Sequence, residues 1–198
     1  MGTPTSSLEI FKLLTNSVLS CKGARFVCFD IKNFYLGTPL DRPEYAGIHL
    51  KDIPEDFIAE YNLTSYARDG WVYFLILKCV YGLPQARKLA NNLLRKCLYK
   101  KGYYEAATTP GLWLHKWRPV IFYLTVDDFG IEFVCEQHTK HLLGTLQEHY
   151  TVTTYWEGGE YICVDLEWDY KSRTCRLTLE KYIRQLLLRY GHPAPRKP

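Results

Sequence analysis

The sequence predicts an α+β fold, in which an antiparallel sheet has helices packed on one face. Two apolar runs rich in β-branched and aromatic residues, 119–126 and 131–135, flank a turn-forming cluster of Asp127, Asp128, Phe129 and Gly130. This pattern is typical of a β-hairpin. The strongest helical periodicity lies apart from it, between residue 85 and about residue 101. Strand and helix signals in separate segments indicate the α+β class.

Composition sets the size and general class of the protein. The chain has 198 residues and is 47% hydrophobic, so we expect one domain, or one domain with a lobe, around a sizeable core. The net charge of +4 permits a polyanionic partner without requiring one. No apolar run approaches the roughly 20 residues of a membrane span, and no signal peptide is recognisable. We therefore expect no membrane partner.

The seven cysteines are scattered and form no C-x-x-C pair. Several lie inside apolar runs, which favours buried reduced thiols over a disulfide framework or a zinc site. Reduced thiols indicate a cytoplasmic or nuclear location.

The first part of the chain is expected to form a helix and a central strand. Residues 3–20 have helical spacing, and Ser6 and Glu9 form a possible capping box. Residues 24–29 read as a strand that ends at Asp30. Residues 37–70 look irregular, apart from a helix start at residues 52–55, where Pro54 takes the first helical position. Residues 71–78 read as a strand.

The helix at residues 85–101 has an apolar stripe on one side and basic residues on the others. The basic surface fits contact with a phosphate backbone, and the alternative is a solvated helix face. The candidate nucleic-acid contacts are Arg87, Lys88, Arg95 and Lys96.

The remaining segments continue the mixture of helices and strands. Residues 138–150 read as a helix. Residues 151–156 and 160–170 read as strands joined by Gly158 and Gly159. Residues 176–179 form a strand or the start of a helix, and residues 181–190 form a helix closed by Gly191.

Three aspartates are the candidate site. Asp30 ends the central strand, and Asp127 and Asp128 lie at the hairpin tip. If strand and hairpin are neighbours, the three carboxylates converge at one edge of the sheet. Mg²⁺ prefers oxygen ligands, and two metals about 4 Å apart serve phosphoryl and nucleotidyl transfer. The alternative is an ordinary acidic turn, since Asp is a favoured turn residue.

Three motifs occur in a characteristic order. Asp30-x-x-x-Phe34-Tyr35 comes first, the run from Tyr81 to Ala86 reads YGLPQA, and Val126-Asp127-Asp128 follows. Together they resemble the reverse transcriptase of copia-type retrotransposons, over residues 7–191. The resemblance implies a reverse-transcriptase palm with partial fingers, spanning residues 1–198 as part of a Pol polyprotein. It also implies RNA-directed DNA polymerase activity.

The resemblance assigns roles to the matched positions. Asp30 and Asp127 would be the principal ligands of Mg²⁺, with Mn²⁺ as a substitute, and Asp128 would be the second carboxylate of the pair. Tyr35 would lie under the sugar of the incoming nucleotide, and Gln85 near nucleotide and template. Core packing for Tyr35 and a solvated position for Gln85 are the alternatives. The implied partners are an RNA or DNA template-primer, deoxynucleoside triphosphates and the remaining Pol polyprotein domains.

The chain also departs from the family pattern. Thr125 replaces the usual Tyr or Phe two positions before Asp127, and no Gly is present near Cys163 and Val164. The earlier fingers strands, most of the thumb and the RNase H domain have no counterpart. We therefore expect little activity from the chain alone. An inactive retroelement remnant that binds nucleic acid weakly is the alternative, and a metal-dependent nuclease is a third hypothesis.

Overall fold

The computed structural model describes residues 8–192, as two compact units. The larger unit comprises Met1–Phe34 and Leu94–Pro198, and the smaller comprises Tyr35–Leu93. Both are built from helices and antiparallel strands, so the chain has a mixed α/β fold.

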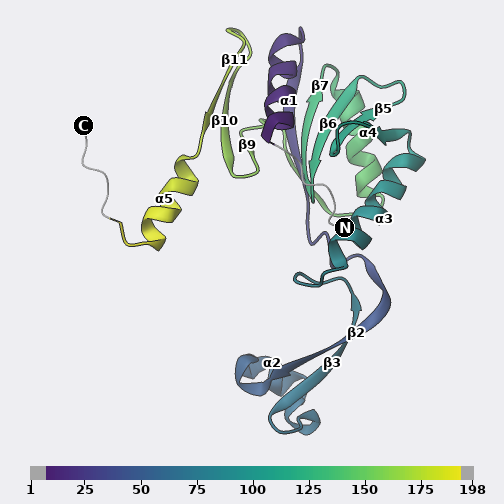
Figure 1. Ribbon diagram of the computed structural model, residues 1–198, viewed down its shortest axis with the longest axis vertical. Coiled ribbons are helices and arrows are strands. Elements are labelled where there is room, and N and C mark those ends of the chain that lie inside the picture. The colour runs from purple at the N-terminus through teal and green to yellow at the C-terminus, as the bar shows by residue number, and fades with distance from the viewer. Residues whose placement is uncertain (1–7, 193–198) are drawn as a thin grey trace. The chain divides into compact units, whose positions relative to one another are not determined.

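A six-stranded antiparallel sheet is the centre of the larger unit (Figure 1). Its strand order is β4-β5-β6-β7-β1-β8. The strands are β4 (Tyr103–Glu105), β5 (Leu112–His115), β6 (Val120–Thr125), β7 (Asp128–Phe133), β1 (Arg25–Ile31) and β8 (Val152–Tyr155). The expected hairpin is confirmed as β6–β7, and β1 lies between two strands that come about a hundred residues later in the chain.

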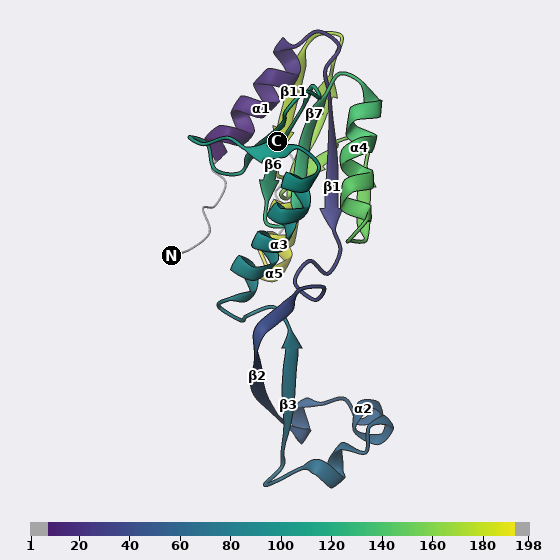
Figure 2. The same cartoon turned by 90° about the vertical axis from the view of Figure 1, so that its right-hand side faces the viewer.

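Helices lie on both sides of this sheet (Figure 2). On one face, α4 (Glu136–Gln147) and the last turns of α3 (Ala86–Lys100) cover buried rings such as Phe122 and Trp113. Tyr99 of α3 contacts the ring of Trp113, and His141 of α4 contacts Tyr103. This face agrees with the expected helical layer.

The first helix, α1 (Leu8–Ser20), packs against the opposite face. Its side chains Phe11, Leu14 and Val18 join a buried cluster with Phe26 and Tyr123. The expectation that helices cover only one face is therefore wrong for α1, because its apolar stripe needs a partner and the aromatic residues of β1 and β6 supply it. The possible capping box falls partly outside the described residues, since Ser6 is not among them.

A smaller sheet of three strands, in the order β11-β10-β9, covers the same face as α1. Its strands are β9 (Glu160–Tyr161), β10 (Val164–Asp169) and β11 (Thr174–Thr178). The single strand expected at residues 160–170 is thus two strands. Ile162 and Cys163 form the turn between them, with φ of 50° and 62°. Two positive φ values are the pattern of a type I′ turn, which usually takes Asn-Gly. Because Ile and Cys are not typical of such a turn, the sequence does not predict it.

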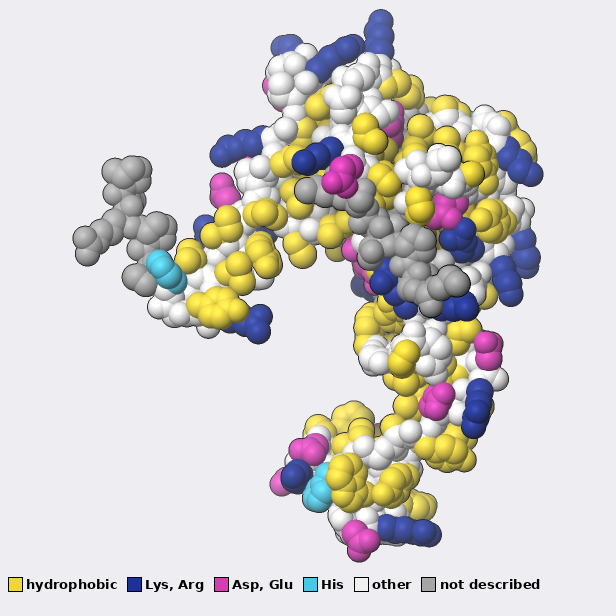
Figure 3. All heavy atoms as spheres, in the orientation of Figure 1, with side chains coloured by type: hydrophobic (Ala, Val, Ile, Leu, Met, Phe, Trp, Pro, Cys, Tyr) yellow, Lys and Arg dark blue, Asp and Glu magenta, His cyan; other side chains and the backbone are white. Residues whose placement is uncertain are grey.

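The last helix, α5 (Glu180–Arg189), is amphipathic but exposes much of its apolar side. Hydrophobic side chains gather visibly along it (Figure 3), among them Ile183 and Leu188, which are 51% and 77% exposed. Lys181 anchors its first turn by ion pairs of 2.7 Å to Glu160 and 3.0 Å to Asp165.

The smaller unit is built on a two-stranded ribbon of β2 (Pro39–His49) and β3 (Trp71–Lys78). Between these strands lie η1 (Leu50–Asp52), α2 (Glu55–Glu60) and η2 (Leu63–Tyr66). The helix start near Pro54 is confirmed, but Pro54 is the N-cap and Glu55 is the first helical residue. The expectation that residues 37–70 are irregular is wrong, because an eleven-residue strand occupies part of this segment.

The pairing of β2 with β3 shifts between Pro39 and Glu44, where four residues of β2 stand opposite Leu77 alone. Such a bulge bends the strand and redirects its side chains. It also leaves Pro43 outside the regular ladder, where its missing N–H does no harm.

The cysteines agree with the expectation of free thiols, although Cys21, Cys135 and Cys163 are exposed rather than buried. Every cysteine is free, and Cys28, Cys79 and Cys97 are buried. Among residues 8–192, no helix is both long enough and apolar enough to cross a bilayer.

Candidate functional site

Asp30 and Asp128 are direct partners in the pairing of β1 with β7. Directly opposite residues on antiparallel strands place their side chains on the same face, with Cβ atoms about 4.5–5.5 Å apart. Both side chains are half-buried. Two like charges are therefore adjacent, as the strand-end and hairpin positions in the sequence predict.

Asp127 lies at the tip of the β6–β7 hairpin, between the paired residues Thr125 and Asp128. Its backbone carbonyl accepts a hydrogen bond of 3.1 Å from the N–H of Ile31, which ties the tip to the end of β1. The other tip residue, Val126, has φ of 60°. A left-handed backbone is unfavourable for a β-branched residue, so the tip is held under strain beside the carboxylates.

The proton affinities of the hairpin carboxylates reflect this crowding. Burial, followed by the charges of Asp127 and Asp30, raises the pKa of Asp128 from 3.8 to about 6. Burial is also the main cause that raises the pKa of Asp127, with the charge of Asp30 adding to it. A cation at this position would stabilise the ionised forms.

A cleft of about 830 Å³ opens over the carboxylate pair within the larger unit. Asp30, Asp128 and Cys28 lie along its strands, and the β8 end and the β9–β10 turn form its walls. Aromatic side chains line part of it, and Lys181 lies at its margin. The volume and the mixture of apolar walls with a few charged groups are typical of a ligand site.

Tyr161 supports the carboxylate hairpin from beneath, a role that the sequence did not indicate. Its hydroxyl donates a 3.0 Å hydrogen bond to the carbonyl of Tyr123 and lies 3.4 Å from the Thr125 hydroxyl. Its ring occupies the space above Gly130, where an added Cβ would come within 3.0 Å of it. The only hint in the sequence is the residue type, because a buried Tyr usually finds a hydrogen-bond partner for its hydroxyl.

The donor atoms suit Mg²⁺, but the side chains do not form a ready-made cage. Asp30, Asp127 and Asp128 offer only oxygen ligands, which this ion prefers. Within residues 8–192, no three side chains of the His, Cys, Asp and Glu types are gathered closely enough to hold a metal ion. Mg²⁺ sites commonly combine one or two carboxylates with water and substrate phosphates, so a carboxylate pair fits this ion.

The predicted nucleotide-binding residues lie in the smaller unit. Tyr35 is half-buried, packs beside Leu40 and Cys79, and contacts the ring of Tyr81 edge-on at 4.8 Å. Gln85 donates a 3.1 Å hydrogen bond from its side-chain nitrogen to Glu44. The alternative interpretation of Tyr35 as a packing residue thus has a physical basis, whereas Gln85 is half-buried and bonded rather than simply solvated.

The predicted basic contacts on α3 differ in their surroundings. Lys88 and Lys96 are exposed, and Arg87 is half-buried. Arg95 is bound within the fold, since it pairs with Glu105 and lies 5.5 Å from the ring centre of Trp113. Because the charge of Arg95 is already compensated by Glu105, Lys96 is better placed than Arg95 to bind a phosphate group.

No family model matches the chain. No curated protein matches it either. Two solved structures of apo telomerase from Candida tropicalis, one truncated from its C-terminal domain, resemble 88% and 89% of the chain, with TM-scores of 0.46 and 0.44. Sequence identity is 11% and 12%, and the chain spans only 37% and 41% of those chains. Likeness at this level carries no inference about function.

Proposed function

We propose that this chain is the palm-centred part of a copia-type RNA-directed DNA polymerase that extends a primer by two-metal nucleotidyl transfer. The observation that carries the proposal is the pairing of Asp30 with Asp128, with Asp127 at the adjoining hairpin tip. The three motifs alone suggest this convergence. The pairing register supports it independently, because strand pairing depends on the whole sheet rather than on any motif.

Each part of the chain has a task in this reaction. Asp30 and Asp127 would be the principal ligands of Mg²⁺, and Asp128, which pairs with Asp30, would be the second carboxylate of the hairpin. The strained hairpin tip would fix the positions of Asp127 and Asp128. When bound, Mg²⁺ supplies charge neutralisation at the α-phosphate and lowers the proton affinity of the primer 3′-hydroxyl. Tyr161 and Gly130 hold the hairpin against the second sheet. Most of the catalytic effect would come from positioning and electrostatic stabilisation.

The substrates of the proposed reaction are an RNA or DNA template-primer and deoxynucleoside triphosphates. Tyr35 would then limit the space for a 2′-hydroxyl, and Gln85 would lie near nucleotide and template. Lys96, Lys88 and Arg87 would contact phosphates. The remaining Pol polyprotein domains would supply the rest of the grip on the duplex.

An inactive remnant is the second candidate, and one observation favours it. The carboxylates of the described chain do not form a ready-made three-ligand cluster. In a remnant, the pair would persist as a structural feature without binding Mg²⁺ selectively.

Metal binding separates the two candidates without requiring the full enzyme. We expect Mn²⁺, titrated into the 198-residue chain, to broaden NMR signals of β1 and β7 around Asp30 and Asp128. Mg²⁺ should compete, and Asp30→Asn should abolish the effect. Broadening elsewhere, or none, would support the remnant. Primer extension on a heteropolymeric RNA template should be weak for this chain, and any synthesis should disappear in Asp127→Asn.

A further inference from the structure

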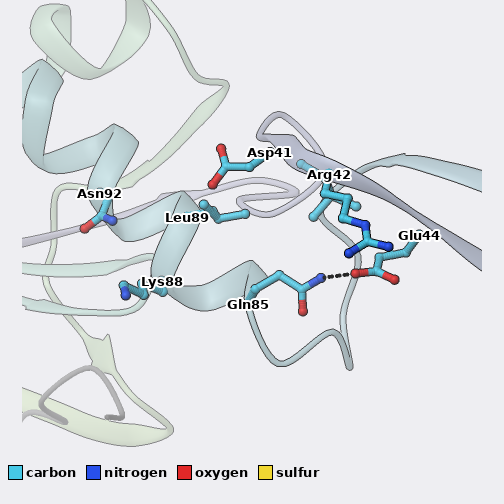
Figure 4. Close-up of a pocket in the computed structure, with 8 residues that line it drawn as sticks. Asp41, Arg42, Glu44, Gln85, Lys88, Leu89 and Asn92 are labelled. Atoms are coloured by element: carbon cyan, nitrogen blue, oxygen red, sulfur yellow. Dashed lines mark hydrogen bonds between the residues drawn. The ribbon is translucent and has the colours of Figure 1, made fainter.

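A second pocket lies wholly within the smaller unit, between the bulge of β2 and the start of α3 (Figure 4). It encloses about 440 Å³. The bulge supplies Asp41 and Arg42, Glu44 follows it where regular pairing resumes, and the facing side chains come from residues 85–92. Bulges of this kind are often placed where a side chain must be redirected toward a site.

The other side of the pocket comes from the start of α3 and the residue before it. Gln85, which directly precedes the helix, and Lys88 and Asn92 within it recur at spacings of three and four residues, the spacing of neighbours on one helix face. Leu40 and Leu89 provide the apolar part of the lining. The pocket is therefore apolar in part, with hydrogen-bonding groups around it.

The charges of the lining are balanced, and this limits the possible ligands. Two carboxylates, Asp41 and Glu44, stand against the two cations Arg42 and Lys88. A free phosphate would be repelled by the carboxylates, and a metal or organic cation by Arg42 and Lys88. A neutral, planar molecule with both donors and acceptors on its edge satisfies all of these groups.

Asp41 is available for such a ligand. Among the described residues it forms no hydrogen bond or ion pair. Its charge acts on the buried thiol of Cys79, whose pKa is raised mainly by burial and secondly by Asp41. Glu44 is different, since the side-chain amide of Gln85 holds one of its oxygens at 3.1 Å. Asp41 therefore offers a free pair of acceptor oxygens, and Arg42 offers donors beside it.

We propose that this pocket binds an unpaired guanine base. Guanine presents two adjacent donors, N1–H and the 2-amino group, which match the two oxygens of the Asp41 carboxylate. Its O6 and N7 are acceptors, and Arg or Lys is their usual partner. The volume suits a base with part of its sugar. The proposal goes beyond polymerisation, because it gives the smaller unit a base-reading role that does not depend on Mg²⁺.

Nucleoside binding by the full 198-residue chain tests the proposal directly. Guanosine should shift NMR signals of residues 40–44 and 85–92, while adenosine and cytidine should not. Inosine, which lacks the 2-amino group, should bind more weakly than guanosine. Equal shifts with all four nucleosides, or shifts outside the pocket, would overturn the assignment.

Matched variants test the roles of individual residues. A fluorescent thymidine hexamer with one central guanosine should bind roughly ten- to a hundred-fold more weakly to Asp41→Asn, the range expected for a lost two-point base contact. Arg42→Gln should act in the same direction. Asp69→Asn and Arg68→Gln are the controls, since these exposed residues of the same unit do not line the pocket. Equal loss in the controls would reject the site.

The outcome is independent of the proposed polymerase activity. Guanosine binding without Mn²⁺ binding at Asp30 would leave the pocket valid and remove the polymerase proposal. Mn²⁺ binding without discrimination among nucleosides would do the reverse. Because Asp41 and Arg42 are exposed, neither variant should disturb folding, and circular dichroism checks this.

Discussion

Gly130 lies directly beneath the ring of Tyr161, so closely that a Cβ on Gly130 would come within 3.0 Å of that ring and of Phe26. The contact joins the carboxylate hairpin to the β9–β10 hairpin, and Gly130 and Tyr161 are both buried. We expect Gly130→Ala to lower the free energy of unfolding by about 1–3 kcal/mol, the usual cost of overpacking a core. Urea unfolding measures the change.

A matched glycine provides the control for this prediction. Gly144 is exposed within α4 and has open space where its Cβ would lie. Gly144→Ala should therefore stabilise the chain by up to about 1 kcal/mol, through helix propensity alone. Equal effects of the two substitutions would contradict the close contact between Gly130 and Tyr161.

The second prediction concerns the pH dependence contributed by Asp128. Its pKa is about 6 in the folded chain, compared with the ordinary value of 3.8 for an aspartate side chain in water. The folded state thus binds the proton more tightly, so this group contributes stability that is fully present below pH 3.8 and lost as the pH rises through 6. Asp128→Asn should therefore be more stable than the parent at about pH 7, and the difference should vanish near pH 4.

We expect a gain of about 1 kcal/mol at pH 7, less than the full effect of such a pKa change because the carboxyl group is half exposed. Mg²⁺ provides a second measurement. It should raise the stability of the parent at neutral pH by binding only the folded state, and it should leave Asp128→Asn unchanged. If Mg²⁺ does not change the stability of the parent chain, the metal site is contradicted, whereas the raised pKa of Asp128 is not.

The third prediction concerns the turn of Ile162 and Cys163. Each left-handed non-glycine residue costs on the order of 1–3 kcal/mol. Ile162→Asn combined with Cys163→Gly introduces the residues that this turn prefers, and should raise the free energy of unfolding by about 1–2 kcal/mol. Ile48→Asn is the control, because Ile48 is also an exposed isoleucine but has no positive φ. It should give no gain.

The fourth prediction separates two neighbouring basic residues of α3. Lys96→Ala should weaken binding of single-stranded RNA and make it less sensitive to salt, with stability unchanged within about 0.5 kcal/mol. Arg95→Ala should cost about 1–3 kcal/mol of stability, because it removes the ion-pair partner of the half-buried Glu105, which keeps only its hydrogen bond from the Gly111 N–H. Lys171→Ala, a charge change in the β10–β11 turn, is the control for non-specific loss of positive charge.

Sequence patterns are informative where apolar residues run continuously along a strand or recur periodically along a helix. The hairpin at Asp127, the strand that ends near Asp30 and the helix α3 each carry an apolar pattern that matches their geometry. These elements and the mixed fold class are therefore accessible from sequence. The pairing of Asp30 with Asp128 is not, because it depends on which strands of the sheet become neighbours.

Other features have no local signal. Strand β2 contains Pro39, Pro43 and Gly47, which disfavour a strand, and only its pairing with β3 holds it extended. The turn at Ile162 lacks every usual turn residue, so its pattern predicts a continuous strand. The pocket at Asp41 depends on the bulge, which places residues far apart in sequence on facing sides. In the sequence, the pocket is marked only by the polar residues between Pro39 and Pro43 and by the polar spacing of Gln85, Lys88 and Asn92.

The position of β1 in the sheet also determines when the carboxylate pair can form. Asp30 emerges from the ribosome early, yet both of its neighbours in the sheet, β7 and β8, are made about a hundred residues later. Contacts so distant in sequence require closure of a long loop before they stabilise anything, and they slow folding. Nascent chains that stop before residue 128 therefore hold Asp30 without its partner, and the two aspartates should come together only in a late step of folding.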